Sequence, residues 1–114
     1  MNTIAVQPLS PDLSVAPQLG PEAMEAVAQA GFRSVINNRP DFEAGPHQPT
    51  HASIEAAAEA AGLAYAFLPV APGYQSPEEV QRFAELMATL PKPILAFCRS
   101  GTRSGKLFRA ATGG

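Results

Sequence analysis

The chain has 114 residues, of which 46% are apolar and 16% are charged, and its formal net charge is −2. A chain of this length can bury one hydrophobic core, so we predict a single domain over residues 1–114. It lacks a run of about 18 apolar residues, which excludes a transmembrane helix, and its first residues do not resemble a secretory signal. A single cysteine, Cys98, excludes an intramolecular disulfide, and with only two histidines it argues against a zinc site. We therefore expect a cytoplasmic protein that uses no metal and no cofactor.

The charges are unevenly distributed along the chain. All ten acidic residues lie between Asp12 and Glu85, whereas residues 86–114 carry five cations and no carboxylate. The first 85 residues, with three cations, therefore have a net charge of −7 and the remainder has +5. A basic segment this short predicts a local anion-binding site more than a nucleic-acid surface, and no membrane partner is expected. A solvated helix face is the alternative, which explains Lys106 and Arg109 better than Arg99 and Arg103.

The first half of the chain predicts two strands and a helix between them. Residues 13–16 alternate apolar residues with small or polar ones, which is typical of a short strand. A helix is expected from Pro21, because proline is favoured at the first helical position. Gly31 would end it, as a left-handed cap. The β-branched run at residues 34–36 predicts a buried strand, and residues 37–49, rich in Pro, Gly and Asn, predict a loop.

The second half repeats this alternation. Thr50 is a suitable N-cap for a helix that runs to Ala61, and residues 64–68 predict the next strand. The sequence Ser-Pro-Glu-Glu from Ser76 is a capping box with proline at the first helical position, and it predicts a third helix that Pro91 ends.

The remaining elements complete the predicted fold. The apolar run at residues 94–97 is typical of a central strand that is covered on both faces. A loop at residues 98–103 follows, and then a helix to about Ala111. Strands that alternate with helices predict an α/β fold with a mostly parallel four-stranded sheet and helices on both faces. In such folds ligands bind at the carboxyl ends of the strands, so the loop between the last strand and the last helix is the candidate active loop.

The residues of this loop favour a reactive thiol at Cys98. Gly101 permits a backbone conformation in which the loop curls with its N–H groups pointing inward. The start of the next helix adds its positive end, and Arg103 can direct a planar fork of donors into the same space. Together these groups would lower the pKa of the Cys98 thiol. A free cysteine at a strand end can also be an inert core residue, but two arginines and a glycine within the next five positions argue against that alternative.

The loop resembles the active loops of the cysteine-phosphatase and rhodanese-type superfamilies. Its sequence is Cys98-Arg99-Ser100-Gly101-Thr102-Arg103-Ser104. With the segments Leu13–Leu19, Asn37–Asp41 and Ala60–Leu63, it is similar to a bacterial family of phosphatase-like domains. That family is also found fused to β-lactamase-like hydrolases and is often labelled a sulfurtransferase. The resemblance runs from about Leu9 to Lys106 and implies a dual-specificity-phosphatase-like fold.

Three departures from the phosphatase pattern favour sulfur transfer. Four residues separate Cys98 from Arg103, as in rhodaneses, whereas tyrosine-phosphatase loops have five. The loop at residues 70–75 contains no carboxylate that could protonate a leaving alkoxide. Phe97 stands where phosphatases usually have histidine. We therefore expect a sulfurtransferase in which Cys98 attacks a sulfane sulfur of thiosulfate or of a glutathione-type persulfide and becomes a persulfide held by Arg103.

The expected site residues follow from this mechanism. Cys98 and Arg103 are the predicted catalytic residues. The predicted substrate-binding residues are Arg99, Ser100, Gly101, Thr102, Ser104 and Arg39. Of these, Arg99 would attract the anionic donor, and the hydroxyl groups of Thr102 or Ser104 would bond the thiolate. Because Cys98 is the only cysteine, the acceptor must be an external thiol or cyanide. The family context implies a role in sulfide metabolism with a persulfide dioxygenase as a partner.

Two alternatives remain open at this point. The first is a cysteine-dependent phosphatase with a Cys98 phosphoenzyme, for which Asp41 or Glu43 would have to act as a substitute acid. The second is a non-catalytic module that senses anions or sulfur compounds. For Asp41 the alternative is a role only in a turn, and for Arg39 it is a surface charge without a role in the site.

Overall fold

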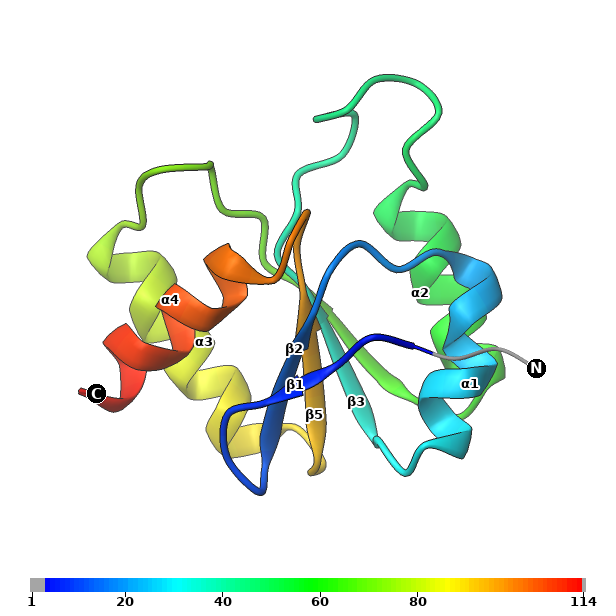
Figure 1. Cartoon of the computed structure of the whole chain (residues 1–114), viewed down its shortest axis with the longest axis horizontal. Helices are drawn as coiled ribbons and strands as arrows, with labels where there is room; N and C mark the ends of the chain where they lie inside the picture. Colours follow the sequence, from blue (N-terminus) through cyan, green and yellow to red (C-terminus); the bar gives the residue numbers. More distant parts are fainter. Residues whose placement is uncertain (1–3, 114) are drawn as a thin grey trace.

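The computed structural model describes residues 4–113, which form a single sheet with helices on either side (Figure 1). Its strands are β1 (Gln7–Pro8), β2 (Leu13–Ala16), β3 (Ser34–Asn37), β4 (Ala64–Phe67) and β5 (Ile94–Phe97). Its helices are the 3₁₀ helix η1 (Pro21–Ala23), α1 (Met24–Gln29), α2 (His51–Ala60), α3 (Pro77–Thr89) and α4 (Thr102–Thr112). The strand order is β1-β2-β5-β3-β4, and β2, β5, β3 and β4 are parallel. The predicted α/β fold with its four parallel strands is confirmed.

The fifth strand, β1, was not predicted. It consists of two exposed residues that pair antiparallel with β2 at the edge of the sheet. Pro8 lacks a backbone N–H, and a strand this short has no alternation of apolar residues, so nothing in the local sequence marks it. It lies at the opposite edge of the sheet from β4 and therefore leaves the central strands unchanged.

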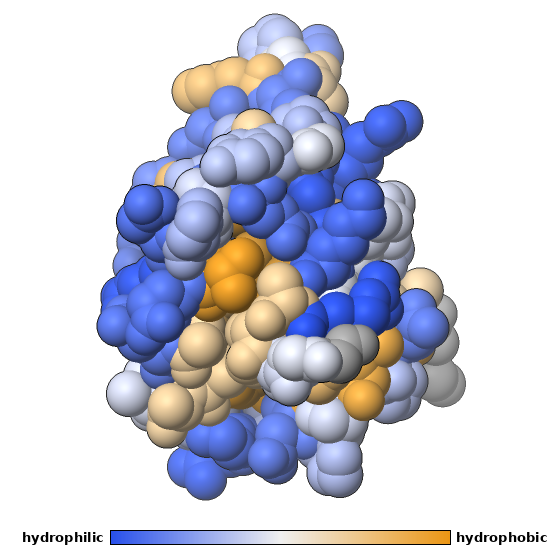
Figure 2. All heavy atoms as spheres, turned by 90° about the vertical axis from the view of Figure 1, so that its left-hand side faces the viewer, coloured by the Kyte–Doolittle hydropathy of each residue, from blue (hydrophilic) through white to orange (hydrophobic). Residues whose placement is uncertain are grey.

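The two faces of the sheet are covered by different helices, as the alternation of side chains along β5 requires. Leu95 and Phe97 point to the face covered by α1 and α2, whereas Ile94 and Ala96 point to the face covered by α3 and α4. All four side chains are at most 1% exposed, so β5 is buried on both faces. The outer surface on the α3–α4 side is hydrophilic around a smaller apolar area (Figure 2).

The helix boundaries follow from local caps. The Thr50 side chain accepts a hydrogen bond from the Ser53 N–H and begins α2, and Ser76 and Glu79 form the predicted capping box of α3. The last helix begins at Thr102, two residues earlier than predicted, so that Arg103 belongs to its first turn. No helix within residues 4–113 is long and apolar enough to cross a membrane.

The carboxyl ends of β3, β4 and β5 lie at one edge of the sheet, and the chain segments that follow them gather there (Figure 1). These segments are residues 38–50, 68–76 and 98–101. In the sheet β5 lies between β2 and β3. Cys98, which follows β5, therefore lies between the segments that follow β2 and β3.

Candidate active site

The Cys98 loop is attached to the end of the neighbouring strand β2. The Cys98 N–H donates to the Ala16 carbonyl oxygen at 3.4 Å, and the Arg99 carbonyl accepts from the Gln18 N–H at 3.2 Å. Gly101 has φ 92, and a β-carbon at this position would lie 3.5 Å from the Ala16 backbone. The space would admit that carbon, so it is the left-handed backbone conformation that favours glycine here.

The Cys98 side chain is fully buried at the centre of this loop. The Gly101 N–H donates to Cys98 Sγ at 3.1 Å. Burial raises the pKa of the thiol, but hydrogen bonds from the backbone N–H groups of Ser104, Ser100, Gly101 and Arg103 outweigh it, so the pKa lies below its usual value. A cradle of four donors around one sulfur favours the thiolate, which is the nucleophilic form.

The Arg103 side chain is held in one orientation by Glu43. Its Nη1 donates to Glu43 Oε2 at 2.8 Å and its Nη2 to Glu43 Oε1 at 2.7 Å, which is a bidentate pair. Nη1 also donates to the Val70 carbonyl at 3.0 Å. These bonds use three of the five N–H donors of a guanidinium group. Within residues 4–113, the Nε–H and the second Nη2–H have no hydrogen-bond partner, so they remain available for an anion.

Glu43 is shared between two arginines. Arg39 Nε donates to Glu43 Oε1 at 2.8 Å. The hydrogen bond from Arg103 is the main reason why the pKa of Glu43 falls from 4.5 to about 2, and the bond from Arg39 contributes further. The same pairing raises the pKa of Arg103. Glu43 is therefore ionised at neutral pH. It cannot serve as the substitute acid that the phosphatase alternative assigned to Asp41 or Glu43.

Asn38 connects the active loop to the neighbouring strand ends. Its Oδ1 accepts from Ser104 Oγ at 2.8 Å, and its Nδ2 donates to the Leu68 carbonyl at 3.0 Å. Its N–H donates to the Phe97 carbonyl at 2.8 Å. Asn38 and Ser104 are both 0% exposed, so these bonds fix the start of α4 against β3 and hold the Cys98 loop in shape.

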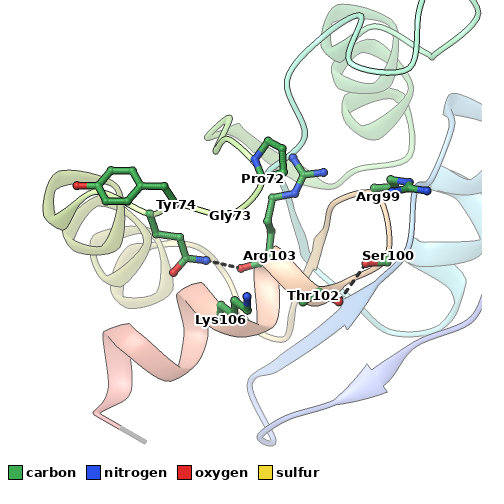
Figure 3. Close-up of a pocket in the computed structure, with 9 residues that line it drawn as sticks. Pro72, Gly73, Tyr74, Arg99, Ser100, Thr102, Arg103 and Lys106 are labelled. Carbon is green, nitrogen blue, oxygen red and sulfur yellow. Dashed lines mark hydrogen bonds between the residues drawn. The ribbon is translucent and has the colours of Figure 1, made fainter.

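A pocket of about 480 Å³ opens beside the loop (Figure 3). It is lined by Pro72, Gly73, Tyr74, Gln75, Arg99, Ser100, Thr102, Arg103 and Lys106. Gln75 Nε2 donates to the Arg103 carbonyl at 3.0 Å and ties the segment after β4 to the first turn of α4. Three cationic residues and no carboxylate line this space, which suits an anionic ligand.

The structure brings most of the predicted site residues together. Cys98, Gly101 and Arg103 form the cradle, and Arg99 and Ser100 lie at the pocket. The predicted hydroxyl contacts to the thiolate are wrong. Thr102 Oγ1 accepts from Ser100 Oγ at 3.0 Å, and the Ser104 hydroxyl bonds Asn38, so Ser104 reaches the sulfur through its backbone N–H instead.

Two residues of the loop after β3 have structural contacts that the sequence did not indicate. Arg39 is 7% exposed, and beyond Glu43 it donates from Nη1 to Gln18 Oε1 at 3.1 Å, so its guanidinium is largely occupied. Asp41 Oδ1 accepts from the His51 N–H at 2.8 Å at the start of α2. Its carboxylate thus binds a helix N-terminus, and it does not line the pocket.

Sequence reasoning missed three further residues of the site. Asn38 and Gln75 act through side-chain bonds to partners 30 or 28 positions away, and Lys106 lines the pocket from the second turn of α4. Polar residues directly after a predicted parallel strand were the available signal for Asn38. For Lys106 the available signal was that no acidic residue follows Glu85, so the cations of the last helix have no carboxylate near them in sequence.

We expect the Cys98 thiol to titrate at a lower pH in the folded protein than in the unfolded protein, whose value is about 8.5. The four backbone donors stabilise the thiolate only while the loop is folded. The rate of iodoacetamide alkylation as a function of pH measures this midpoint, with the protein in urea as the matched control. A folded midpoint at or above the unfolded one would contradict the cradle.

The Glu43 pairing predicts acid sensitivity. Because the folded pKa of Glu43, about 2, is below its ordinary value of 4.5, its stabilising contribution is complete above pH 4.5 and is lost as the pH falls toward 2. With allowance for solvent screening, we expect a loss of about 2 kcal/mol in the free energy of unfolding over this interval. Urea denaturation at a series of pH values checks it. Glu43→Gln should flatten the dependence, whereas Glu85→Gln, in an exposed pair with Arg82, should leave it unchanged.

Comparison with known proteins places this site in a family. Residues 5–114 match the phosphatase-like domain of beta-lactamase hydrolase-like proteins. A beta-lactamase hydrolase-like protein of Agrobacterium fabrum is 37% identical over 106 residues, which are 93% of this chain and 22% of that protein. The chain thus spans about a fifth of the length of the curated relatives it matches.

Solved structures agree with this assignment. A candidate phosphatase from Neisseria meningitidis is 36% identical, with a TM-score of 0.84, and the match covers 94% of this chain and 78% of that one. A kinase-associated phosphatase, solved with its catalytic cysteine replaced by serine, is 15% identical with a TM-score of 0.76. That match covers 96% of this chain and 73% of the phosphatase, and at this identity it shows the fold alone: a cysteine-phosphatase-like fold.

These findings contradict the expectation of a sulfurtransferase. The family is described as phosphatase-like and the Neisseria relative as a candidate phosphatase, and neither as a sulfurtransferase. The argument from loop spacing fails for a physical reason. Although only four residues separate Cys98 from Arg103, Arg103 and Ser104 lie in the first turn of α4, and their N–H groups still reach the sulfur. The chain belongs to the family of phosphatase-like domains of beta-lactamase hydrolase-like proteins.

Proposed function

We propose that this domain is a cysteine-dependent phosphatase that hydrolyses phosphomonoesters through a phosphoenzyme on Cys98. The observation that supports the proposal best is the ring of four backbone N–H groups around Cys98 Sγ, with the Arg103 guanidinium held beside it by Glu43. A thiolate inside an anion cradle is what nucleophilic attack on a phosphate ester requires. The phosphatase descriptions of the family and of its Neisseria relative agree with it.

The reaction has two steps. The Cys98 thiolate attacks phosphorus and forms the S–P bond as the bond from phosphorus to the ester oxygen breaks, and the alcohol leaves as its anion. Water then attacks phosphorus, the S–P bond breaks, and inorganic phosphate and the thiolate are released. In both steps the free Nε–H and Nη2–H of Arg103, with the loop N–H groups, stabilise the charge on the non-bridging oxygens.

The proposed substrates are phosphate esters with a good leaving group, such as aryl phosphates. A general acid would protonate a poor leaving group, but no carboxylate lines the pocket, and Glu43 is ionised and bound to two arginines. Asp41 is bonded to the start of α2. Without such an acid the leaving oxygen must carry its own negative charge, which a phenoxide does far better than an alkoxide.

Acid quenching during turnover of para-nitrophenyl phosphate tests the proposal. We expect mass spectrometry to find a phosphoryl group on the peptide that contains Cys98, and we expect a simple alkyl phosphate to be hydrolysed far more slowly. Thiosulfate serves as the comparison donor. Hydrolysis without a Cys98 phosphoenzyme, or a Cys98 persulfide from thiosulfate with no phosphate release from the ester, would refute the proposal.

The proposal extends to the surroundings of the domain. A nucleophilic thiolate loses activity on oxidation, and no second cysteine is present to form a protective disulfide. We therefore propose that the domain works in a reducing compartment such as the cytoplasm and that its partner is a small anionic phosphate compound.

A further inference from the structure

The pocket beside Cys98 contains more positive charge than one phosphoryl group needs. The loop N–H groups and Arg103 already form a complete cradle. Two further cationic residues, Arg99 and Lys106, line the same pocket of about 480 Å³, and a phosphoryl group would fill only a small part of it. Arg99 and Arg103 also line an adjoining cavity that includes Glu43, but no carboxylate lines the pocket that contains Lys106.

Lys106 is placed next to the cradle by the helical repeat. It lies three positions after Arg103 and four after Thr102 in α4, and residues at these spacings are neighbours on a helix surface. Figure 3 shows Lys106 on α4, close to Arg103 and Thr102. Glu43 offsets the charge of Arg103, whereas in residues 4–113 Lys106 forms no salt bridge. Its ammonium group is therefore available to a bound anion beside the cradle.

Arg99 approaches the pocket from the other side. It follows Cys98 directly, its side chain is exposed, and Figure 3 shows it across Arg103 from Lys106. Its backbone is fixed, because its carbonyl accepts from the Gln18 N–H, while its guanidinium forms no salt bridge within the described residues. Arg103 differs, since Glu43 pairs with it in a bidentate manner. The two unpaired cations therefore flank the position of the substrate phosphate.

We propose that Lys106 forms a second anion subsite beside the Cys98 cradle, so that the preferred substrate is a phosphomonoester that carries another negatively charged group near its leaving oxygen. The inference rests on the proposed phosphatase function. The reacting phosphoryl group occupies the Cys98 cradle, and the second anion, a carboxylate or phosphate, lies toward Lys106, with Arg99 on the opposite side of Arg103. The second group adds binding without taking part in bond breaking.

A matched set of chromogenic substrates tests this subsite. The set consists of para-nitrophenyl phosphate, 3-carboxy-4-nitrophenyl phosphate and its 3-carbamoyl analogue, which has the size of the carboxylate without its charge. We expect kcat/KM for the carboxylate to exceed that for the carbamoyl compound by about tenfold, as one charge-assisted contact would produce. In Lys106→Gln this ratio should fall to about one to threefold, whereas Arg109→Gln, which removes an exposed cation further along α4 outside the pocket, should retain it.

The outcomes separate this inference from the proposed function. If all three substrates are hydrolysed by a Cys98-dependent reaction at equal kcat/KM, the second subsite is refuted and the phosphatase stands. Equal losses in Lys106→Gln and Arg109→Gln would also refute it, because they would show only a general effect of helix charge. Activity that persists in Cys98→Ser, or no hydrolysis of any of the three esters, would refute the phosphatase itself and the subsite with it.

Discussion

Replacing Cys98 with serine is expected to lower kcat/KM for para-nitrophenyl phosphate by about four orders of magnitude or more. The hydroxyl has nearly the same size as the thiol and can accept the same backbone hydrogen bonds, but it remains protonated at neutral pH. The four N–H donors lower the pKa of the Cys98 thiol, and the ordinary pKa of a thiol is only about 8.5. The pKa of a serine hydroxyl is far higher, so the same donors cannot ionise it near pH 7. Steady-state kinetics with purified protein measures the effect.

Because Cys98 is fully buried, a substitution there can also destabilise the fold. The experiment must therefore show that the activity is lost from a folded protein. The melting temperature and far-ultraviolet circular dichroism of Cys98→Ser should match those of the wild-type protein closely. Cys98→Ala serves as a second variant, which removes the nucleophile and the hydrogen-bond acceptor together. If a folded Cys98→Ser protein kept more than about a tenth of the activity, Cys98 would not be the nucleophile.

Arg103→Lys should reduce kcat by about a hundredfold to a thousandfold, with a smaller change in KM. The guanidinium spans Glu43 and the Val70 carbonyl while its Nε–H and second Nη2–H stay directed away from them. A lysine keeps the charge but offers a single ammonium group, which cannot make the bidentate pair and present a second pair of donors at once. Charge builds up on the phosphoryl oxygens in the transition state, so the loss should fall mainly on kcat.

The matched control for this substitution is Arg82→Lys. Arg82 forms a half-exposed pair with Glu85 on α3 at 3.5 Å, away from the pocket, and its replacement should change kcat less than twofold. A small effect of Arg103→Lys, within about fivefold of the wild-type kcat, would mean that Arg103 serves to position Glu43 and the loop and does not stabilise the transition state.

Local sequence signals predicted most of the fold because they act over only a few residues. Thr50 and the Ser76 capping box begin α2 and α3 as expected, and the apolar run at residues 94–97 is the buried central strand. The two-residue strand β1 was missed because its pairing with β2, not its own composition, makes it a strand.

The predicted site was correct in its centre and incomplete in its surroundings. Cys98, Gly101 and Arg103 lie in one short segment of the sequence, so their common loop could be inferred from spacing. Glu43, in contrast, lies 60 positions from Arg103, and sequence reasoning considered it only as an acid. Its pairing with two arginines gives it the opposite character, an anion whose pKa of about 2 keeps it ionised.

The choice between sulfur and phosphate shows the limit of counting residues. The spacing from Cys98 to Arg103 is one residue shorter than in tyrosine-phosphatase loops and for that reason favoured sulfur transfer. In the folded protein the helix begins at Thr102, and the N–H groups of Arg103 and Ser104 complete the cradle. The number of donors around the sulfur depends on where the helix starts, which spacing alone does not specify.

The sequence by itself determined the alternation of strands and helices, the position of the single thiol after the central strand, and the concentration of positive charge in the last 29 residues. Only the tertiary structure decided which of those charges are neutralised. Glu43 comes from the segment after β3 and binds Arg103, whereas Arg99 and Lys106 have no such partner among residues 4–113. The physical reason is that capping and periodicity are local, whereas ion pairing depends on how the parallel strands bring distant segments to one edge of the sheet.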